Sequence, residues 1–228
     1  MLRPFVRAAW LIVRKDVTIE LRSRELLYTT LFFAVAAVLV FAFGFVREGE
    51  PAGDVAAGVL WIAVAFAGTL ALGRTFERER YGETLRGLVL APVERSAIYA
   101  GKLLGLLLLL GALELVLVPI VGLLFRAPFG REAAALALLL ATGTFGFAAV
   151  GTLFAAMLVR ARTRDVLLPV VLYPIAVPVI IGGVRGTAAL VQPEPDLPAA
   201  WMWIGILAAF DAVFLTLALW TFEPVMTE

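Results

Sequence analysis

Histidine and cysteine are both absent from this sequence of 228 residues. The chain therefore has no disulfide, no imidazole base, no thiol nucleophile and no histidine or cysteine ligand for zinc or haem iron. Charged residues are scarce as well, at 16%, against about 25% in an average soluble protein. Apolar residues reach 62%, which excludes a soluble globule. Most membrane enzymes are excluded too, so we expect a chain that is not an enzyme.

Long apolar runs occupy most of the chain. Each has about the 20 residues that a helix needs to cross a bilayer, and none shows the alternation of a strand. Helices are then the form that satisfies their backbone hydrogen bonds in lipid. The sequence predicts an all-α integral membrane protein whose transmembrane domain, residues 26–222, holds six spans. The predicted spans are 26–46, 55–73, 103–125, 133–159, 166–184 and 200–222.

Lysine and arginine are distributed unequally between the connections. Of the 19 cations, six precede the first span, six lie between the second and third, and three follow the fourth. The positive-inside rule places this side, with both termini and the tail 223–228, in the cytoplasm. Aromatic residues at the two ends of the sixth span agree with interfacial anchoring, and the alternative, that they are only large apolar residues, predicts no such pairing at both ends. They are Trp201 and Trp203 at its start, and Trp220 and Phe222 at its end.

Residues 1–25 are expected to form an amphipathic helix in the membrane plane. Arg3, Arg7 and Arg14 share one face, and the opposite face is apolar with a tryptophan at Trp10. Asp16 and Glu20 interrupt the apolar face, so we expect a protein partner or a helix end there. A basic tail that only sets the topology is the alternative.

The connection 74–96 is too long and too patterned to be only a linker. Dense mixed charge at 77–80 is expected to prolong the second span beyond the bilayer. Residues 83–90 then place Leu85, Leu88 and Val89 on one face of a short helix, which Pro92 ends. This apolar stripe fits either a groove of another protein or the lipid headgroups.

Two carboxyl groups lie near the middle of predicted spans. A charge at the bilayer centre costs ~2.5–3.5 kcal/mol on insertion scales, so each must be protonated, hydrated or bonded to another helix. Glu114 and Asp211 could therefore mark a translocation path or a protonation site. The structural alternative is a hydrogen bond between helices, with Thr142, Thr144 or Thr152 as candidate partners.

Proline and glycine predict special backbone positions. Pro169, Pro174 and Pro178 should kink or break the fifth span, and a fixed kink is favoured over a moving hinge. Gly182-Gly183 and residues 192–198 would form the connection that follows it. Gly101 and Gly105 allow a close helix approach, and Lys102 between them is expected to reach the headgroups.

Two stretches carry a resemblance to a known family. Residues 58–102, GVLWIAVAFAGTLALGRTFERERYGETLRGLVLAPVERSAIYAGK, and the proline-spaced residues 167–184 resemble the haem exporter protein B (CcmB) family. The resemblance implies a permease of the type-2 ABC transporter fold, with residues 1–25 as its elbow helix. It also implies that the connection 74–96 is the coupling segment for an ATPase. The contact residues implied are Glu77, Arg78, Glu79, Arg80, Glu83, Leu85 and Leu88.

The resemblance further implies a haem-export or haem-release complex of c-type cytochrome biogenesis in a bacterial inner membrane. Its expected partners are a cytosolic ATPase subunit, a haem-handling membrane subunit and a small single-span subunit, with a periplasmic haem chaperone downstream and no nucleic acid. ATP would bind to the partner, because the sequence has no G-x-x-x-x-G-K-S/T motif. Haem would be a transported or relayed ligand, and the chain alone would hold no cofactor.

Two other functions remain open from the sequence. One is a type-2 ABC permease for a lipid or a drug. The other is a non-transporting scaffold that relays ATPase motion to a haem-handling subunit.

Overall fold

The computed structural model describes residues 2–45, 53–75, 94–159, 161 and 163–227. In this part of the chain every regular element is a helix, and six of the helices are long and apolar enough to cross a membrane. The predicted all-α membrane bundle is therefore confirmed. The helices are α1 (Leu2–Ser23), α2 (Glu25–Phe45), α3 (Gly53–Thr75), α6 (Arg95–Leu124), α7 (Ala133–Met157), α8 (Arg164–Val191) and α9 (Leu197–Thr227).

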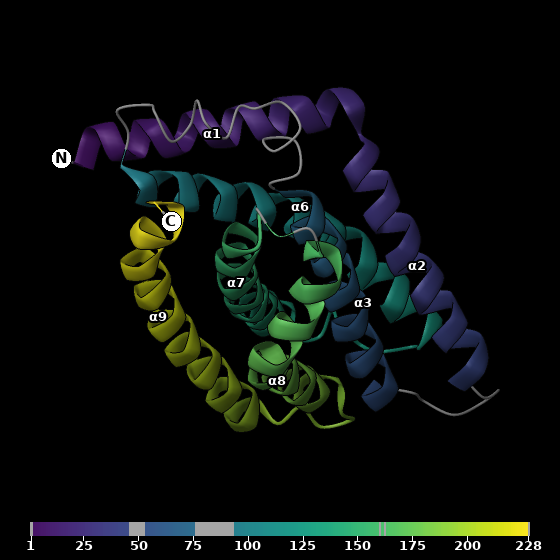
Figure 1. The fold of residues 1–228 in the computed structure, drawn as a ribbon. Helices are drawn as coiled ribbons and strands as arrows, with labels where there is room; N and C mark the ends of the chain where they lie inside the picture. Colours follow the sequence, from purple (N-terminus) through teal and green to yellow (C-terminus); the bar gives the residue numbers. More distant parts are fainter. Residues whose placement is uncertain (1, 46–52, 76–93, 160, 162, 228) are drawn as a thin grey trace.

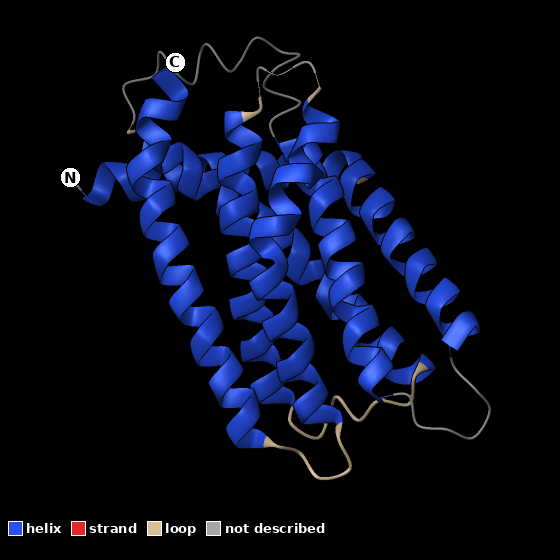
Figure 2. Ribbon diagram, turned by 60° about the horizontal axis from the view of Figure 1, so that its bottom comes forward, coloured by secondary structure: helices blue, strands red, loops and turns tan. Residues whose placement is uncertain are grey.

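Helix α1 lies across one end of the bundle, and the chain termini lie at that same end (Figures 1 and 2). Its buried side chains Ala9, Ile12 and Val13 share one face, whereas Trp10 and Arg14 are exposed. The apolar surface of α1 is thus divided between two environments. One stripe packs on the protein, and a neighbouring stripe is left for lipid.

The turn from α1 into α2 is fixed by two local features. Arg24 adopts a left-handed backbone conformation with φ 53°, at the point where the chain turns from α1 into α2. Glu20 Oε1 accepts a hydrogen bond from the backbone N–H of Leu27 at 2.9 Å, which satisfies an otherwise unpaired donor in the first turn of α2. The carboxylate at position 20 therefore marks a helix end.

The centre of the bundle is held by Trp61 of α3. Its ring fills the space over Gly143 of α7 and Gly183 of α8, where any added Cβ would collide with it. Its Nε1 donates a hydrogen bond to Thr187 Oγ1 at 2.9 Å. Glycine on two neighbouring helices therefore makes room for the largest side chain of the core.

This packing corrects the predicted end of the fifth span. Helix α8 continues without interruption to Val191, so Gly182-Gly183 lies inside the helix and the connection consists of the residues between Val191 and Leu197. The two glycines are packing positions rather than turn positions, because Trp61 and Leu207 occupy the space beside them. No re-entrant element occurs in this described connection.

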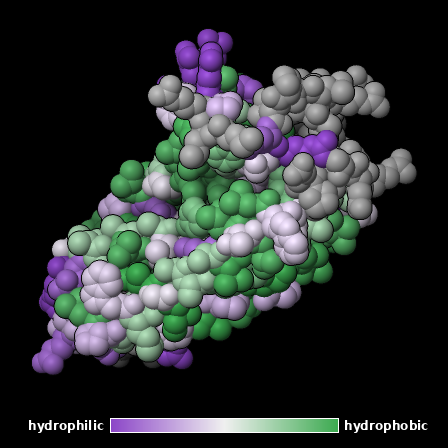
Figure 3. All heavy atoms as spheres, turned by 90° about the vertical axis from the view of Figure 1, so that its left-hand side faces the viewer, coloured by the Kyte–Doolittle hydropathy of each residue, from purple (hydrophilic) through white to green (hydrophobic). Residues whose placement is uncertain are grey.

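The outer surface of the bundle is mostly apolar. On the face shown in Figure 3, green side chains cover much of the middle, and strongly hydrophilic ones gather towards the ends. Large apolar side chains such as Phe43, Leu115 and Leu123 are highly exposed, as expected for contact with lipid. Trp201 and Trp220 are exposed near opposite ends of α9, but Phe222 is fully buried against Tyr99, so it is not an interfacial anchor.

Candidate functional site

A carboxyl and a hydroxyl connect α6 and α7 in the interior of the bundle. Glu114 of α6 is only 9% exposed, and the hydroxyl of Thr144 on α7 donates a hydrogen bond to its Oε1. Among the described residues, this is the one hydrogen bond of that carboxyl. Thr144 is thus the partner of Glu114 among the three threonines considered, whereas Thr142 donates to carbonyl oxygens of its own helix.

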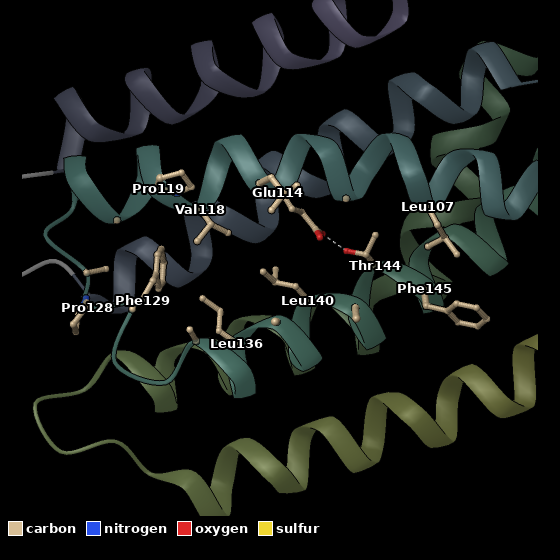
Figure 4. A pocket seen from close by; sticks show the side chains of 18 residues that line it. Leu107, Glu114, Val118, Pro119, Pro128, Phe129, Leu136, Leu140, Thr144 and Phe145 are labelled. Carbon is tan, nitrogen blue, oxygen red and sulfur yellow. Dashed lines mark hydrogen bonds between the residues drawn. The ribbon is translucent and has the colours of Figure 1, made fainter. Parts of the chain in front are cut away.

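A groove of about 830 Å³ lies between the same two helices. Figure 4 shows Glu114 and Thr144 meeting across it, with Phe129 and Pro128 at the end nearer the turn that joins the helices. Leu115, which is 80% exposed, lies on its rim, so the groove opens sideways from the bundle. Small residues that leave the groove wide line both walls, namely Gly111, Gly122, Ala133, Ala137 and Ala141.

The lining of this groove does not fit haem. The described lining residues include no methionine, tyrosine, lysine or arginine, so they offer neither an axial ligand for iron nor a cation for a propionate. Glu114 is the one ionisable group among the described lining residues, and an ionised carboxylate would repel a propionate. The groove is instead suited to an apolar surface that carries a hydrogen-bond donor.

Asp211 of α9 occupies a different environment. Its side chain lies directly over Gly146 of α7, where even one added carbon would collide with Oδ1. That oxygen is buried and has no hydrogen-bond partner among the described residues. The predicted bonds to threonine are therefore absent here. Gly146 makes room for Asp211, which lies between helices rather than in the groove.

Lys102, near the start of α6, is buried and bonded rather than directed to headgroups as the sequence predicted. It is 2% exposed, and its Nζ lies 3.0 Å from Asp16 Oδ2 of α1 and 3.0 Å from the carbonyl oxygen of Thr75 in α3. The expected partner of Asp16 thus comes from the same chain. Gly101 permits this arrangement, because a Cβ there would lie 2.8 Å from Ile12 Cβ and 3.0 Å from the Ala9 carbonyl oxygen.

Arg164, at the start of α8, is a second buried cation near the end of α3. Its guanidinium donates a hydrogen bond to the Gly73 carbonyl oxygen. Carbonyl oxygens in the last turn of a helix have no partner within that helix, and cations are favourable there. The final turn of α3 is therefore held from two neighbouring helices, by Lys102 and by Arg164.

The comparisons with known proteins agree along nearly the whole chain. The family model for CcmB protein matches residues 7–226. The chain belongs to the CcmB family. It is 28% identical over 206 residues to heme exporter protein B of Rhodobacter capsulatus, covering 89% of this chain and 92% of that protein. The protein of the same name from Bradyrhizobium diazoefficiens is 26% identical over 208 residues, covering 90% and 91%.

The residues expected to contact an ATPase lie outside the described part of this CcmB-family chain. They are Glu77, Arg78, Glu79, Arg80, Glu83, Leu85 and Leu88. What the structure does describe is how the chain enters and leaves their segment. Thr75 precedes it and accepts the hydrogen bond from Lys102, which follows it in sequence on α6.

The three prolines of the fifth span lie inside one uninterrupted helix. Pro169, Pro174 and Pro178 all belong to α8, so the span is not broken at any of them. The neighbouring Tyr173 hydroxyl accepts a hydrogen bond from Thr69 Oγ1 of α3 at 3.3 Å. A fourth proline, Pro119, lies within α6 and lines the groove, and sequence reasoning had not selected it.

Sequence reasoning also missed Trp61, Arg164 and the partner of Lys102. Each depends on residues far apart in the chain, such as the 126 positions between Trp61 and Thr187. A signal was present for the lysine, because Asp16 on an apolar helix face requires an opposite charge. Its neighbour Lys15 lies 3.1 Å from Oδ1, but only the folded chain shows that the buried Lys102 meets the other oxygen.

Proposed function

We propose that this chain is the permease subunit of an ABC transporter complex that exports or releases haem in c-type cytochrome biogenesis. The observation that carries the proposal is the family match from residue 7 to 226. Relatives named heme exporter protein B support it, because their sequences align with about nine-tenths of this chain. The six candidate membrane spans of this chain are also what a permease requires. Haem is the substrate in this proposal, and no residue of the described groove is required to ligate its iron.

Coupling to an ATPase is the second part of the proposal. The segment 74–96 would contact the ATPase through Glu77, Arg78, Glu79, Arg80, Glu83, Leu85 and Leu88. The helices on both sides of that segment support this role. Lys102 links α3, α6 and α1, and Arg164 links α3 to α8. A displacement of the end of α3 would therefore be transmitted to α1, α6 and α8.

The proposed location is a bacterial inner membrane with both termini in the cytoplasm. Both termini lie at one end of the bundle, which is also the end where α1 crosses it. In this arrangement α1 is the elbow helix, residues 26–222 form the membrane domain, and residues 223–228 form a tail in which α9 continues to Thr227. The other proposed partners are a haem-handling membrane subunit and a small single-span subunit.

A relay role is a second candidate, favoured by the chemistry of the groove. The described lining of the groove has no haem ligand and no cation, so in this candidate haem passes on a neighbouring subunit while this chain transmits ATPase motion. Transport and relay differ in where haem can be trapped. Photoactivatable haem analogues should label this chain during turnover if it forms the path, and only a neighbouring subunit if it acts as a relay.

Complementation tests the proposal directly. A bacterial strain that lacks its own CcmB should regain c-type cytochromes, seen by haem staining of membrane proteins, when this chain is expressed with its cognate ATPase and membrane subunits. The double charge reversal Glu79→Arg/Arg80→Glu should reduce ATPase co-purification at unchanged levels of the chain. Normal cytochromes in the strain without any CcmB would contradict the proposal. The purified chain alone should not hydrolyse ATP.

A further inference from the structure

We propose that the groove between α6 and α7 is the docking site for one transmembrane helix of a different protein chain, which presents a hydrogen-bond donor to Glu114. The donor would be a hydroxyl, an amide or a cationic group on an otherwise apolar helix. This docking requires only that the chain spans a bilayer, and it does not depend on what the complex carries.

The shape of the groove fits a helix. Its lining on α6 runs from Leu107 to Gly122, which at 1.5 Å per residue is about 22 Å, or four helical turns. Ala133, Ala137 and Ala141 recur every four residues on α7, and all three are exposed along the groove. Small residues at this spacing let a second helix backbone approach closely, as is common in membrane proteins.

The carboxyl group of Glu114 in the groove indicates which side chain the docked helix presents. Glu114 is nine-tenths buried, and among the described residues only the Thr144 hydroxyl bonds to it. A carboxyl group has further acceptor positions, which a hydrocarbon environment would leave empty at a cost in free energy. A lipid acyl chain brings no donor, whereas a polar side chain on a docked helix does. The groove therefore favours a protein helix over a lipid tail.

A second copy of this chain is a poorer match for the groove than a helix of another chain. In a two-fold contact centred on the groove, the two grooves would face each other and Glu114 would approach its own equivalent. The exposed hydroxyls of α9 are also engaged, because Thr216 and Thr221 donate to carbonyl oxygens of their own helix at 2.7 Å. The proposed occupant is therefore a helix of another chain, and the cross-linking test below distinguishes it from a second copy.

The absence of cysteine makes a cross-linking test clean. Ala137→Cys places a single thiol in the groove for a short photoactivatable cross-linker, applied to the complex in its native membranes. Ala209→Cys, at an exposed position of α9 outside the groove, is the matched control. We expect the first thiol to cross-link to an apolar segment of a different chain, identified by mass spectrometry, and the second to give at least tenfold less of that product.

Two further variants test the contact itself. Glu114→Leu should lower the yield of that product about tenfold, the change that corresponds to 1.4 kcal/mol, whereas Glu114→Gln should keep it within about twofold. Ala141→Trp should remove the product by filling the groove, and Ala209→Trp should not.

The thermal unfolding of each purified variant shows whether it still folds, and Gly111→Leu is a second way to narrow the groove. Cross-linking only to lipid or to a second copy, or a yield unaffected by Glu114→Leu, would overturn the proposal.

Discussion

The two buried charged side chains of α6, Lys102 and Glu114, lie twelve residues apart and have contrasting surroundings. Lys102 donates to a carboxylate of α1 and to a carbonyl of α3 at 3.0 Å each, in a junction where the helices are closely packed. Glu114 has one hydroxyl partner and faces an open groove. The glycines beside them differ in the same way, because a Cβ would collide with α1 at Gly101 but meets nothing within 4 Å at Gly111.

This contrast separates a charge that holds the chain together from one that remains available to another molecule. A buried ion needs an opposite charge and further hydrogen bonds to offset the loss of hydration. Lys102 obtains both from its own chain. Among the described residues, Glu114 obtains one hydrogen bond. Its other acceptor positions are therefore available to whatever fills the groove.

The largest effect is expected from Lys102→Met. Removing the cation leaves the partly buried Asp16 without this partner and the Thr75 carbonyl without its donor, and the loss of one member of a buried pair costs about 3 kcal/mol. The melting temperature of the purified protein in detergent should fall by several degrees, measured by fluorescence-detected gel filtration after heating.

The double variant Lys102→Met/Asp16→Leu is the control for this loss. It removes both charges together, and an apolar replacement for a buried pair is often close to neutral. We therefore expect it to regain most of the lost stability. If the single variant melts like the wild type, the junction does not hold α1 in place.

A comparison of two glycines on α6 should give the next largest effect. Gly101→Ala should destabilise the protein by about 1–3 kcal/mol, because its methyl group forces α1 away from α6. Gly111→Ala introduces the same methyl group into open space and should change the melting temperature little. Equal effects of the two substitutions would show that helix propensity, and not close approach, governs both positions.

The six spans could be predicted because hydrophobicity along a chain is a local property. Runs of about 20 apolar residues predict helices wherever they occur, and all six appear in the structure. The ends of the helices depend on packing between helices as well. The sequence predicts Gly182-Gly183 in the connection after the fifth span, but the space that these glycines leave is filled by Trp61 of α3 and Leu207 of α9.

The site was only partly predictable, because its chemistry depends on which helices are neighbours. Glu114 and Asp211 were selected from the sequence by the cost of a carboxyl in lipid. Nothing in the sequence shows that one faces a groove beside Thr144 and the other lies against Gly146. The same limit applies to Phe222, whose place at a span end suited an anchor, although packing against Tyr99 buries it.

The smallest effect is expected at the hydroxyl that meets Glu114. Thr144→Val removes the one described hydrogen bond of the carboxyl, and such bonds between transmembrane helices average only about 0.6 kcal/mol. Thr142→Val is the matched control on the same helix, because that hydroxyl bonds only to carbonyl oxygens of its own helix among the described residues. Detergent unfolding should therefore show a difference of less than about 1 kcal/mol between the two variants. A loss at Thr144 as large as that at Lys102 would mean that the Glu114 pair holds the bundle together, and the contrast between the two charges of α6 would then fail.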